Sequence, residues 1–328
     1  MHLVPDQKMK LSYMKKIFYL PLFLLWICIG CSKGKTTAAP FVYVPPVTPP
    51  VVVVPGTTVS DTILNGVNLQ PSYYNDGNPN VDWALMKQQT NIKTVRIEIE
   101  PDKATQAKTW IAQAKTNGLT VIATYHKYTV LGSDDATELT TAANWWKNNY
   151  AALGGNFIIN MMNEWGSHNI TPAAYATAYN SAIAIVRTVY SGPIVIDIPG
   201  WGQETYTAYQ AVKISNPVIA DTNIILSAHI YPNGWNQGRN HNIQPSDLDD
   251  ITNTGRRGII GEFGNGATGN VDWAACVDKA KLKGWPVLGW CWNGDGGAMN
   301  MVQPSWASNA TANSFTLSAY FSVIYNKL

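Results

Sequence analysis

The ten residues NFIINMMNEW, from Asn156 to Trp165, form an apolar run that ends abruptly in the polar pair Asn163 and Glu164. A short, continuous apolar run is typical of a strand that is buried on both faces, as in a parallel sheet. We therefore predict a strand that delivers an amide and a carboxylate to one place. Similar runs recur along the chain, so this stretch is one unit of a larger pattern.

Eight such runs follow Asp61, and helical stretches alternate with them. The predicted strands are Ile63–Gln70, Thr94–Glu100, Leu119–His126, Asn156–Glu164, Pro193–Gly200, Ile224–Pro232, Gly258–Gly264 and Pro286–Asn293. Eight strand–helix units over roughly 260 residues predict an α/β fold, a closed (β/α)8 TIM barrel, as a single domain. A doubly wound open sheet is the alternative, but neither G-x-G-x-x-G nor G-x-x-x-x-G-K-[ST] follows the first strand.

The stretches between the predicted strands carry helix-end signals. KATQAKTWIAQAKTNG and WAACVDKAKLKG each close on a glycine, which can adopt the left-handed conformation that ends a helix. The string NVDWA occurs at Asn80–Ala84 and again at Asn270–Ala274, and its short polar residues suit a helix start. Both strings therefore predict helices in the outer layer of the barrel.

Residues 1–31 carry the features of a signal peptide. Lys15 and Lys16 precede the apolar segment IFYLPLFLLWICIG, whose 14 residues are too few for a membrane-spanning helix and are typical of a signal-peptide core. Met1 and Met14 both stay open as the start. The segment predicts that the protein is exported.

The end of this segment, CIGCSKGK, resembles a bacterial lipoprotein signal, in which the cysteine after the cleavage site is lipidated. We predict cleavage before Cys31 and lipidation of Cys31. The protein would then be an outer-membrane or cell-surface lipoprotein that touches the membrane only through its lipid anchor. Cys28 stands where such signals usually carry Leu, so ordinary cleavage and secretion is the alternative.

Residues 32–58 are predicted to be a linker. They include TTAAPFVYVPPVTPPVVVVPG, where repeated prolines prevent a helix and favour an extended spacer. An edge strand at VVVV is the alternative, but proline on both sides of so short a run argues against it. The predicted domains are therefore 1–31, 32–58 and a barrel domain at 59–328.

The composition limits the classes of ligand. The net charge of +2 comes from 23 basic and 21 acidic residues without a long basic block, which argues against nucleic acid as a partner. With 13 Trp and 16 Tyr beside only 13% charged residues, the chain suits uncharged, hydroxyl-rich ligands, because aromatic faces stack on sugar C–H surfaces. Most of these rings are nevertheless expected in the core. We predict a monomer.

Ionisable and polar residues gather at the C-terminal ends of the predicted strands, where TIM barrels carry their active sites. They are Arg96, Glu98, His126, Asn163, Glu164, His229, Tyr231, Glu262 and Trp290. Two carboxylates, Glu164 and Glu262, end the fourth and seventh strands. Hydrolysis of a glycosidic bond needs a proton donor and a second carboxylate, about 5 to 5.5 Å apart in a retaining mechanism. A salt bridge is the alternative for either glutamate taken alone.

Four motifs resemble glycoside hydrolase family 5, a family of retaining (β/α)8 enzymes. They are NEW (163–165), HIY (229–231), GEFG (261–264) and GWCWNGDG (289–296). The resemblance implies that Glu164 is the acid/base and Glu262 the nucleophile. It further implies that Asn163 binds the sugar 2-hydroxyl.

The same resemblance assigns roles to the neighbouring residues. Arg96 would hold the nucleophile ionised, and Tyr231 would donate a hydrogen bond to that carboxylate. His126 and His229 would line the subsite around the scissile bond. Trp290 would be the platform under the sugar, and Trp292 is predicted to bind substrate beside it.

The motif PGWGQ, at 199–203, is most similar to bacterial β-1,4-mannanases of the family, although cellulases share nearly all of the catalytic pattern. We predict a retaining endo-β-1,4-glycanase acting on plant-type polysaccharide, with mannan or glucomannan favoured. A cellulase or xyloglucanase is the alternative within the family. A non-catalytic, glycan-binding surface lipoprotein is the alternative of another class.

Metal and disulfide sites have weaker signals. His126 and His229 lie on separate strands without H-x-H or H-E-x-x-H spacing, so we predict no metal and no cofactor. The loop GSDDATE does not match an EF-hand and is predicted to be a solvated acidic loop. If Trp290 faces the barrel mouth, Cys291 points outward to the helix that carries Cys276. A disulfide and two buried thiols both stay open for that pair.

Overall fold

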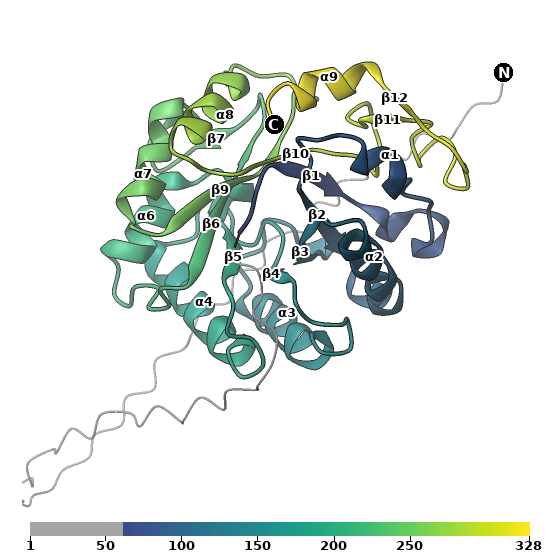
Figure 1. Ribbon diagram of the computed structural model, residues 1–328. Helices are drawn as coiled ribbons and strands as arrows, with labels where there is room; N and C mark the ends of the chain where they lie inside the picture. Colours follow the sequence, from purple (N-terminus) through teal and green to yellow (C-terminus); the bar gives the residue numbers. More distant parts are fainter. Residues whose placement is uncertain (1–61) are drawn as a thin grey trace, which may run out of the picture. The chain divides into compact units, whose positions relative to one another are not determined.

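The structure is a computed structural model that describes residues 62–328. The predicted signal segment, Cys31 and the linker at 32–58 lie outside the described residues, as do positions 59–61. Eight parallel strands close into a barrel in the order β1, β2, β3, β4, β5, β6, β9, β10 (Figure 1). The strands are β1 (Gly66–Leu69), β2 (Thr94–Ile99), β3 (Thr120–Tyr125), β4 (Ile158–Asn160), β5 (Ile194–Asp197), β6 (Ile224–Ile230), β9 (Arg257–Phe263) and β10 (Val287–Gly289). The predicted (β/α)8 barrel is confirmed.

A helix follows each barrel strand, and Figure 1 shows these helices around the ring of strands. They are α1 (Trp83–Lys87), α2 (Ala104–Thr116), α3 (Ala136–Asn149), α4 (Pro172–Val186), α6 (Thr205–Lys213), α7 (Leu248–Asn253), α8 (Trp273–Leu282) and α9 (Ala319–Tyr325). A short turn of helix, α5 (Pro199–Gly202), precedes α6. Two hairpins extend the loops after β6 and β10, namely β7–β8 (Trp235–Asn236 with His241–Asn242) and β11–β12 (Val302–Gln303 with Thr316–Leu317). No described helix is both long and apolar enough to cross a membrane.

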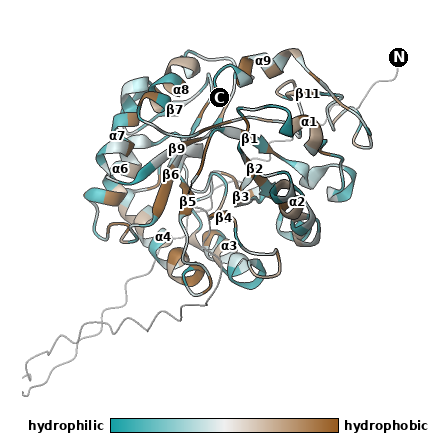
Figure 2. Cartoon of the chain, in the orientation of Figure 1, coloured by the Kyte–Doolittle hydropathy of each residue, from teal (hydrophilic) through white to brown (hydrophobic). Residues whose placement is uncertain are grey.

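The helices form because their apolar residues recur at the spacing of one helix face. In α2 the buried residues are Ala107, Trp110, Ile111 and Ala114, and in α3 they are Leu139, Ala142, Ala143 and Trp146. Both sets follow the pattern i, i+3, i+4, i+7, so each helix buries one stripe against the barrel. Figure 2 shows the result as mixed colours along the helices and apolar colour along strands such as β5.

The predicted helix ends are also present. The side chains of Asp82 and Asp272, one in each NVDWA string, accept hydrogen bonds from the main-chain N–H groups of Leu85 (3.1 Å) and Ala275 (2.9 Å). These bonds satisfy donors that a helix start leaves free. Gly118, just beyond α2, has a φ of +79°, which is the left-handed conformation expected of a terminating glycine.

The barrel interior has two layers. The first, which we call the apolar layer, comprises Ile63, Ile122, Ile158, Val195, Ile225, Ile259 and Leu288. The second, which we call the polar layer, comprises Asn68, Arg96, Glu98, Asn160, Asp197, His229 and Glu262, all buried. Strands alternate their side chains, so inward positions are two residues apart. Ile158 is thus followed by Asn160 and Val195 by Asp197.

Several strands are shorter than predicted at their C-terminal ends. β4 stops at Asn160, so Asn163 and Glu164 lie in the loop that follows, where Glu164 has a φ of +49°. Pro199 and Gly200 belong to α5 rather than to β5. Glu164 and Gly200 lie a few residues beyond the ends of β4 and β5, and their positive φ is incompatible with a strand of the predicted length.

Cys276 and Cys291 are both buried free thiols. Cys291 Sγ lies 3.5 Å from the carbonyl oxygen of Met299. Of the two alternatives left open by the sequence, the structure has the pair of buried thiols.

Candidate active site

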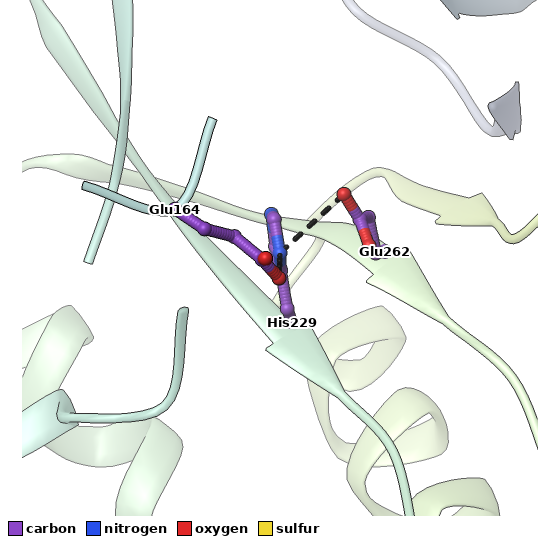
Figure 3. Close-up of side chains that lie close together, drawn as sticks. All are labelled: Glu164, His229 and Glu262. Carbon is purple, nitrogen blue, oxygen red and sulfur yellow. Dashed lines mark hydrogen bonds and ion pairs between the residues drawn. The ribbon is translucent and has the colours of Figure 1, made fainter. Parts of the chain in front are cut away.

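Three side chains from different strands meet at the C-terminal mouth of the barrel (Figure 3). His229 on β6 lies between Glu164, which follows β4, and Glu262 on β9. Its Nδ1 is 2.9 Å from Glu164 Oε1 and 3.5 Å from Glu262 Oε1. One carboxylate oxygen of each glutamate and a nitrogen of His229 all lie within 4.8 Å of one another. The two predicted catalytic carboxylates therefore face each other across a short gap.

Glu262 is held at both oxygens. Arg96 Nη1 donates to Oε1 at 2.8 Å, and the Tyr231 hydroxyl donates to Oε2 at 2.8 Å. A guanidinium and a phenol hydrogen bond both favour the ionised carboxylate. The contacts that the sequence predicted for Arg96 and Tyr231 are thus both present.

Arg96 itself is fully buried and organises the polar layer. It donates to the side-chain oxygens of Asn68 (3.0 Å), Asn160 (2.9 Å) and Asn163 (2.5 Å). Its guanidinium also pairs with Asp197 at 3.2 Å, in addition to Glu262. A buried guanidinium needs this many acceptors because an unpaired buried charge is costly.

Asp197, the last residue of β5, was not among the predicted site residues. It is fully buried, and its Oδ2 accepts the main-chain N–H of Glu164 at 3.1 Å. Burial on its own raises the pKa of this carboxyl, but the charges of His229 and Arg96 outweigh burial and lower it below the usual range. The ionised Asp197 thus anchors the positive-φ turn that presents Glu164. Its sequence signal was a carboxylate two residues after Val195 on the same strand face.

Glu164 has the environment expected of an acid. Burial raises the pKa of its carboxyl and the charge of Glu262 raises it further, against the opposing hydrogen bond from His229. Its side chain keeps 14% exposure, so a ligand in the mouth can reach it. A buried carboxyl that holds its proton beside an ionised partner is the pairing that acid/base chemistry needs.

His229 carries positive charge in this cluster. Burial lowers the pKa of its imidazole, but Glu262 and Asp197 outweigh burial and raise it well above the usual value. The ring is fully buried and lies between the two carboxylates, so it presents no open face to the mouth. Coordination of a metal ion by these three side chains would compete with Arg96 and Tyr231, which already occupy the two oxygens of Glu262.

Asn163 offers a free amide to a ligand. Its Oδ1 accepts from Arg96, whereas its Nδ2 makes no hydrogen bond to another residue in the range 62–328. Trp290, just after β10, keeps 8% exposure, and its main-chain N–H donates to the carbonyl of Phe263 (2.8 Å), next to Glu262. The structure therefore brings both residues to the same mouth as the carboxylate pair.

Trp292 is not brought to this surface. Its side chain has no exposed area, and its indole N–H donates to the carbonyl of Val81 at 2.9 Å. The side chain is part of the core beneath the mouth, so we leave Trp292 out of the proposed ligand contacts. The sequence could not separate it from Trp290 because residues two apart in an extended strand are expected to point to the same face.

His126 directly follows β3 and is nearly buried. Its Nδ1 is 2.9 Å from Glu100 Oε1 and 2.8 Å from the Tyr73 hydroxyl, and its Nε2 is 3.5 Å from Glu98 Oε2. Burial lowers the pKa of His126, but the charges of Glu98 and Glu100 outweigh burial and raise it. His126 is thus embedded in a carboxylate cluster that the sequence did not predict.

The carboxylates of the acidic loop at 134–135 both accept hydrogen bonds from the protein. Asp134 accepts from both the main-chain N–H (2.6 Å) and the hydroxyl (2.8 Å) of Ser167. Asp135 accepts from the main-chain N–H of Thr137 at 2.8 Å and caps α3. The Asp134 carboxylate therefore fastens the loop after β3 to the loop that carries Glu164.

Comparison with known proteins agrees with this geometry. The family model described as Cellulase (glycosyl hydrolase family 5) matches residues 57–296. A mannan endo-1,4-β-mannosidase of Streptomyces lividans is 27% identical over 259 residues, which cover 73% of this chain and 64% of that protein. A mannan endo-1,4-β-mannosidase of Cellvibrio japonicus is 25% identical over 268 residues, covering 77% of this chain and 60% of that protein. The chain thus spans less than two thirds of the length of these two relatives.

Solved structures show the same barrel. A β-mannanase from Thermomonospora fusca superposes with a TM-score of 0.64 at 25% identity, covering 81% of this chain and 89% of that one. An endoglucanase catalytic domain from Thermobifida fusca superposes with a TM-score of 0.61 at 16% identity, covering 80% and 90%, which bears on the fold alone.

Proposed function

Because the chain belongs to glycosyl hydrolase family 5, we propose that it is a retaining endo-β-1,4-glycanase whose substrate is mannan or glucomannan. The observation that carries the proposal is the pair Glu164 and Glu262, of which one carboxylate oxygen each lies within 4.8 Å of the other. This separation suits the retaining geometry of about 5 to 5.5 Å and leaves too little room for the water that an inverting enzyme places between its carboxylates.

In the first step Glu262 attacks the anomeric carbon while Glu164 gives its proton to the leaving glycosidic oxygen. The contacts of Arg96 and Tyr231 hold both oxygens of Glu262 and fix its orientation for the attack. The raised pKa of Glu164, caused mainly by burial, keeps the proton available.

In the second step a water molecule attacks the anomeric carbon of the glycosyl ester, and the bond between that carbon and Glu262 breaks. Formation of that ester removes the negative charge of Glu262, one of the causes that raise the pKa of Glu164. Glu164, which gave up its proton in the first step, is therefore more easily kept ionised and accepts a proton from the attacking water. One pair of carboxylates thus serves both steps.

The neighbouring residues bind the sugar in this proposal. The free Nδ2 of Asn163 donates to the 2-hydroxyl, and the exposed edge of Trp290 contacts the ring at the scissile bond. His126 borders the same subsite, and His229 keeps the two carboxylates apart. Interactions with the 2-hydroxyl strengthen as charge develops in the transition state.

The choice of mannan rests on the curated relatives, which are named as mannanases, together with the motif PGWGQ. The alternative substrate is cellulose or xyloglucan. A relative from Caldicellulosiruptor saccharolyticus, 29% identical over 202 residues that make up 14% of it, is named as both a β-mannanase and an endoglucanase.

Export is part of the proposal because a polymeric substrate cannot enter a cell. The segment up to Gly30 would direct export, and lipidation of Cys31 would anchor the enzyme at the outer membrane or cell surface. Incorporation of labelled palmitate into the wild type but not into Cys31→Ser tests this. Labelling of both proteins, or of neither, would contradict the anchor.

The activity is tested by reducing-sugar release from mannan, glucomannan, carboxymethylcellulose and xyloglucan. The matched control is Glu262→Gln, which keeps the shape of the nucleophile and removes its charge. We expect release from the mannans and a loss of about 10³-fold or more in the variant. Release from cellulose alone would instead identify an endoglucanase. Binding without any release would support the non-catalytic glycan-binding alternative.

A further inference from the structure

A third carboxylate, Glu98, lies inside the active site and takes no part in the two steps above. It is on β2, two residues beyond Arg96, so both side chains point into the barrel. Glu98 is only 1% exposed. It therefore cannot contact the substrate directly, and any role in the reaction must pass through its neighbours.

The contacts of Glu98 tie it to the nucleophile. Its Oε1 accepts from Arg96 Nη1 at 2.9 Å, and the same nitrogen donates to Glu262 Oε1 at 2.8 Å and to Asn68 Oδ1 at 3.0 Å. A guanidinium Nη carries two hydrogens, so three acceptors share two N–H bonds. Glu98 and Glu262 thus draw on one donor.

The other oxygen of Glu98 is also engaged. Oε2 accepts from Gln70 Nε2 at 2.7 Å and lies 3.5 Å from His126 Nε2. The titratable groups that face Glu98 come from every element around it. They are Arg96 on β2, Tyr73 after β1, His126 after β3, Glu164 after β4, Glu262 on β9 and Cys291 after β10.

These surroundings place the titration of Glu98 near neutrality. Burial raises the pKa of its carboxyl to about 7, the charges of Glu262 and Glu164 add to this, and those of His126 and Arg96 oppose it. Glu98 therefore changes charge within the range over which the enzyme would work. Because charge coupling is mutual, an ionised Glu98 also makes it harder for Glu164 to lose its proton.

We propose, on the basis of the proposed function, that Glu98 is a positioning residue that shares Arg96 with the nucleophile and, when ionised, holds the proton on Glu164. The enzyme thereby extends its activity to higher pH. As the pH rises and Glu164 approaches ionisation, Glu98 becomes negative and opposes it. The device needs no movement of the chain.

The sign of the effect can be read from Glu98→Gln, which mimics the protonated residue at every pH. Well below pH 7 the wild type is also neutral at this position, so the acid limbs of the two pH profiles should coincide in position. Above pH 7 only the wild type gains the charge. The basic limb of the variant should therefore lie about half a unit to one unit lower in pH.

The experiment measures kcat/KM on mannohexaose from pH 4 to pH 10 for the wild type, Glu98→Gln and the control Glu138→Gln. Glu138 pairs with Lys127 on the helix side and makes no contact with Arg96. We expect the shifted basic limb in Glu98→Gln only. A variant whose activity falls evenly at all pH values, with both limbs in place, would show a merely structural role and overturn the proposal.

A second variant changes no carboxylate. Gln70→Met removes the donor to Glu98 Oε2, so Glu98 stays neutral to a higher pH, and the basic limb should move in the same direction as in Glu98→Gln. An unmoved limb in this variant would contradict the proposal even if Glu98→Gln does not fold.

A ¹³C-NMR titration of the Glu164 carboxyl separates this inference from the proposed function, because it requires no turnover. The midpoint of Glu164 should fall in Glu98→Gln by the same half to one unit. If Glu98→Gln lowers the midpoint of Glu164 but the wild type cleaves no glycan, the coupling between Glu98 and Glu164 stands and the proposed glycanase activity is refuted. If the midpoint of Glu164 is unchanged in Glu98→Gln but the wild type is active, the glycanase activity stands and the coupling is refuted.

Discussion

The two layers of the barrel interior share the strands β4, β5, β6 and β9 yet differ in almost every physical respect. The apolar layer consists only of Ile, Val and Leu, whereas the polar layer, nearer the C-terminal ends of the strands, contains a guanidinium, an imidazole, three carboxylates and two amides. Aliphatic side chains stabilise through burial alone. Buried charges stabilise only when each has its partners. One layer can therefore be varied for stability, and the other is constrained by chemistry.

The pairing in the polar layer is nearly complete. Arg96 meets three carboxylates, and His229 lies between Glu164, Glu262 and Asp197. The positive charges compensate the negative ones, so the layer can be buried. The comparison shows that electrostatic pairing holds the side chains of the polar layer in place, whereas close packing stabilises the apolar layer beneath it.

The largest effect on stability is expected where the pairing is broken. Asp197→Asn removes a buried charge between Arg96 and His229, and we expect a loss of about 3–5 kcal/mol in the free energy of unfolding at pH 7. The pKa of Asp197 is lowered in the folded state, so its contribution is present above the pKa of an unfolded aspartate and is lost as the pH falls. Urea unfolding at several pH values measures this.

The difference between wild type and Asp197→Asn should therefore narrow below about pH 4, near the unfolded pKa. A gap of equal size at pH 7 and at acid pH would show that Asp197 acts through shape rather than charge. Asp197 would then stabilise the fold by packing, as the residues of the apolar layer do.

A cavity in the apolar layer should cost somewhat less stability and leave the chemistry intact. Ile225→Ala is expected to lower the free energy of unfolding by about 2–5 kcal/mol at every pH, with kcat/KM of the folded enzyme unchanged. The matched control is Leu282→Ala, because Leu282 is 87% exposed and should show almost no change. A large fall in kcat/KM for Ile225→Ala would mean that the two layers are coupled.

The smallest effect on stability is expected for a substitution in the polar layer that removes no charge. Tyr231→Phe removes one hydrogen bond to Glu262 and should lower kcat/KM by about 10- to 100-fold, with a change in stability of about 1 kcal/mol. Tyr150→Phe is the same chemical change far from the polar layer, where the hydroxyl only accepts the N–H of Asn156. Equal activity of both variants would refute the role of Tyr231.

The sequence was sufficient for the architecture because the barrel repeats one local pattern eight times. Each apolar run became a strand, and the recurring Asp82 and Asp272 became helix caps. The C-terminal strand ends were predicted too long. An apolar run does not reveal where backbone torsion angles change, and at Glu164 the turn depends on a hydrogen bond to Asp197 on another strand.

The site was only partly predictable for the same reason. Arg96, Tyr231 and the carboxylate pair were identified by their places at strand ends and by the family resemblance. Asp197 and the contacts of Glu98 depend on which side chains meet across the barrel, which a linear pattern does not contain. Trp292 shows the opposite error, since it shares its spacing with Trp290 but packs into the core.

The central claim is that Glu164 and Glu262 act as a retaining pair, and the anomeric form of the first product tests it most directly. Proton NMR during cleavage of mannohexaose should show the β-anomer of the new reducing end first, with the α-anomer appearing later by mutarotation. Initial formation of the α-anomer would mean a single displacement by water and would contradict Glu262 as the nucleophile.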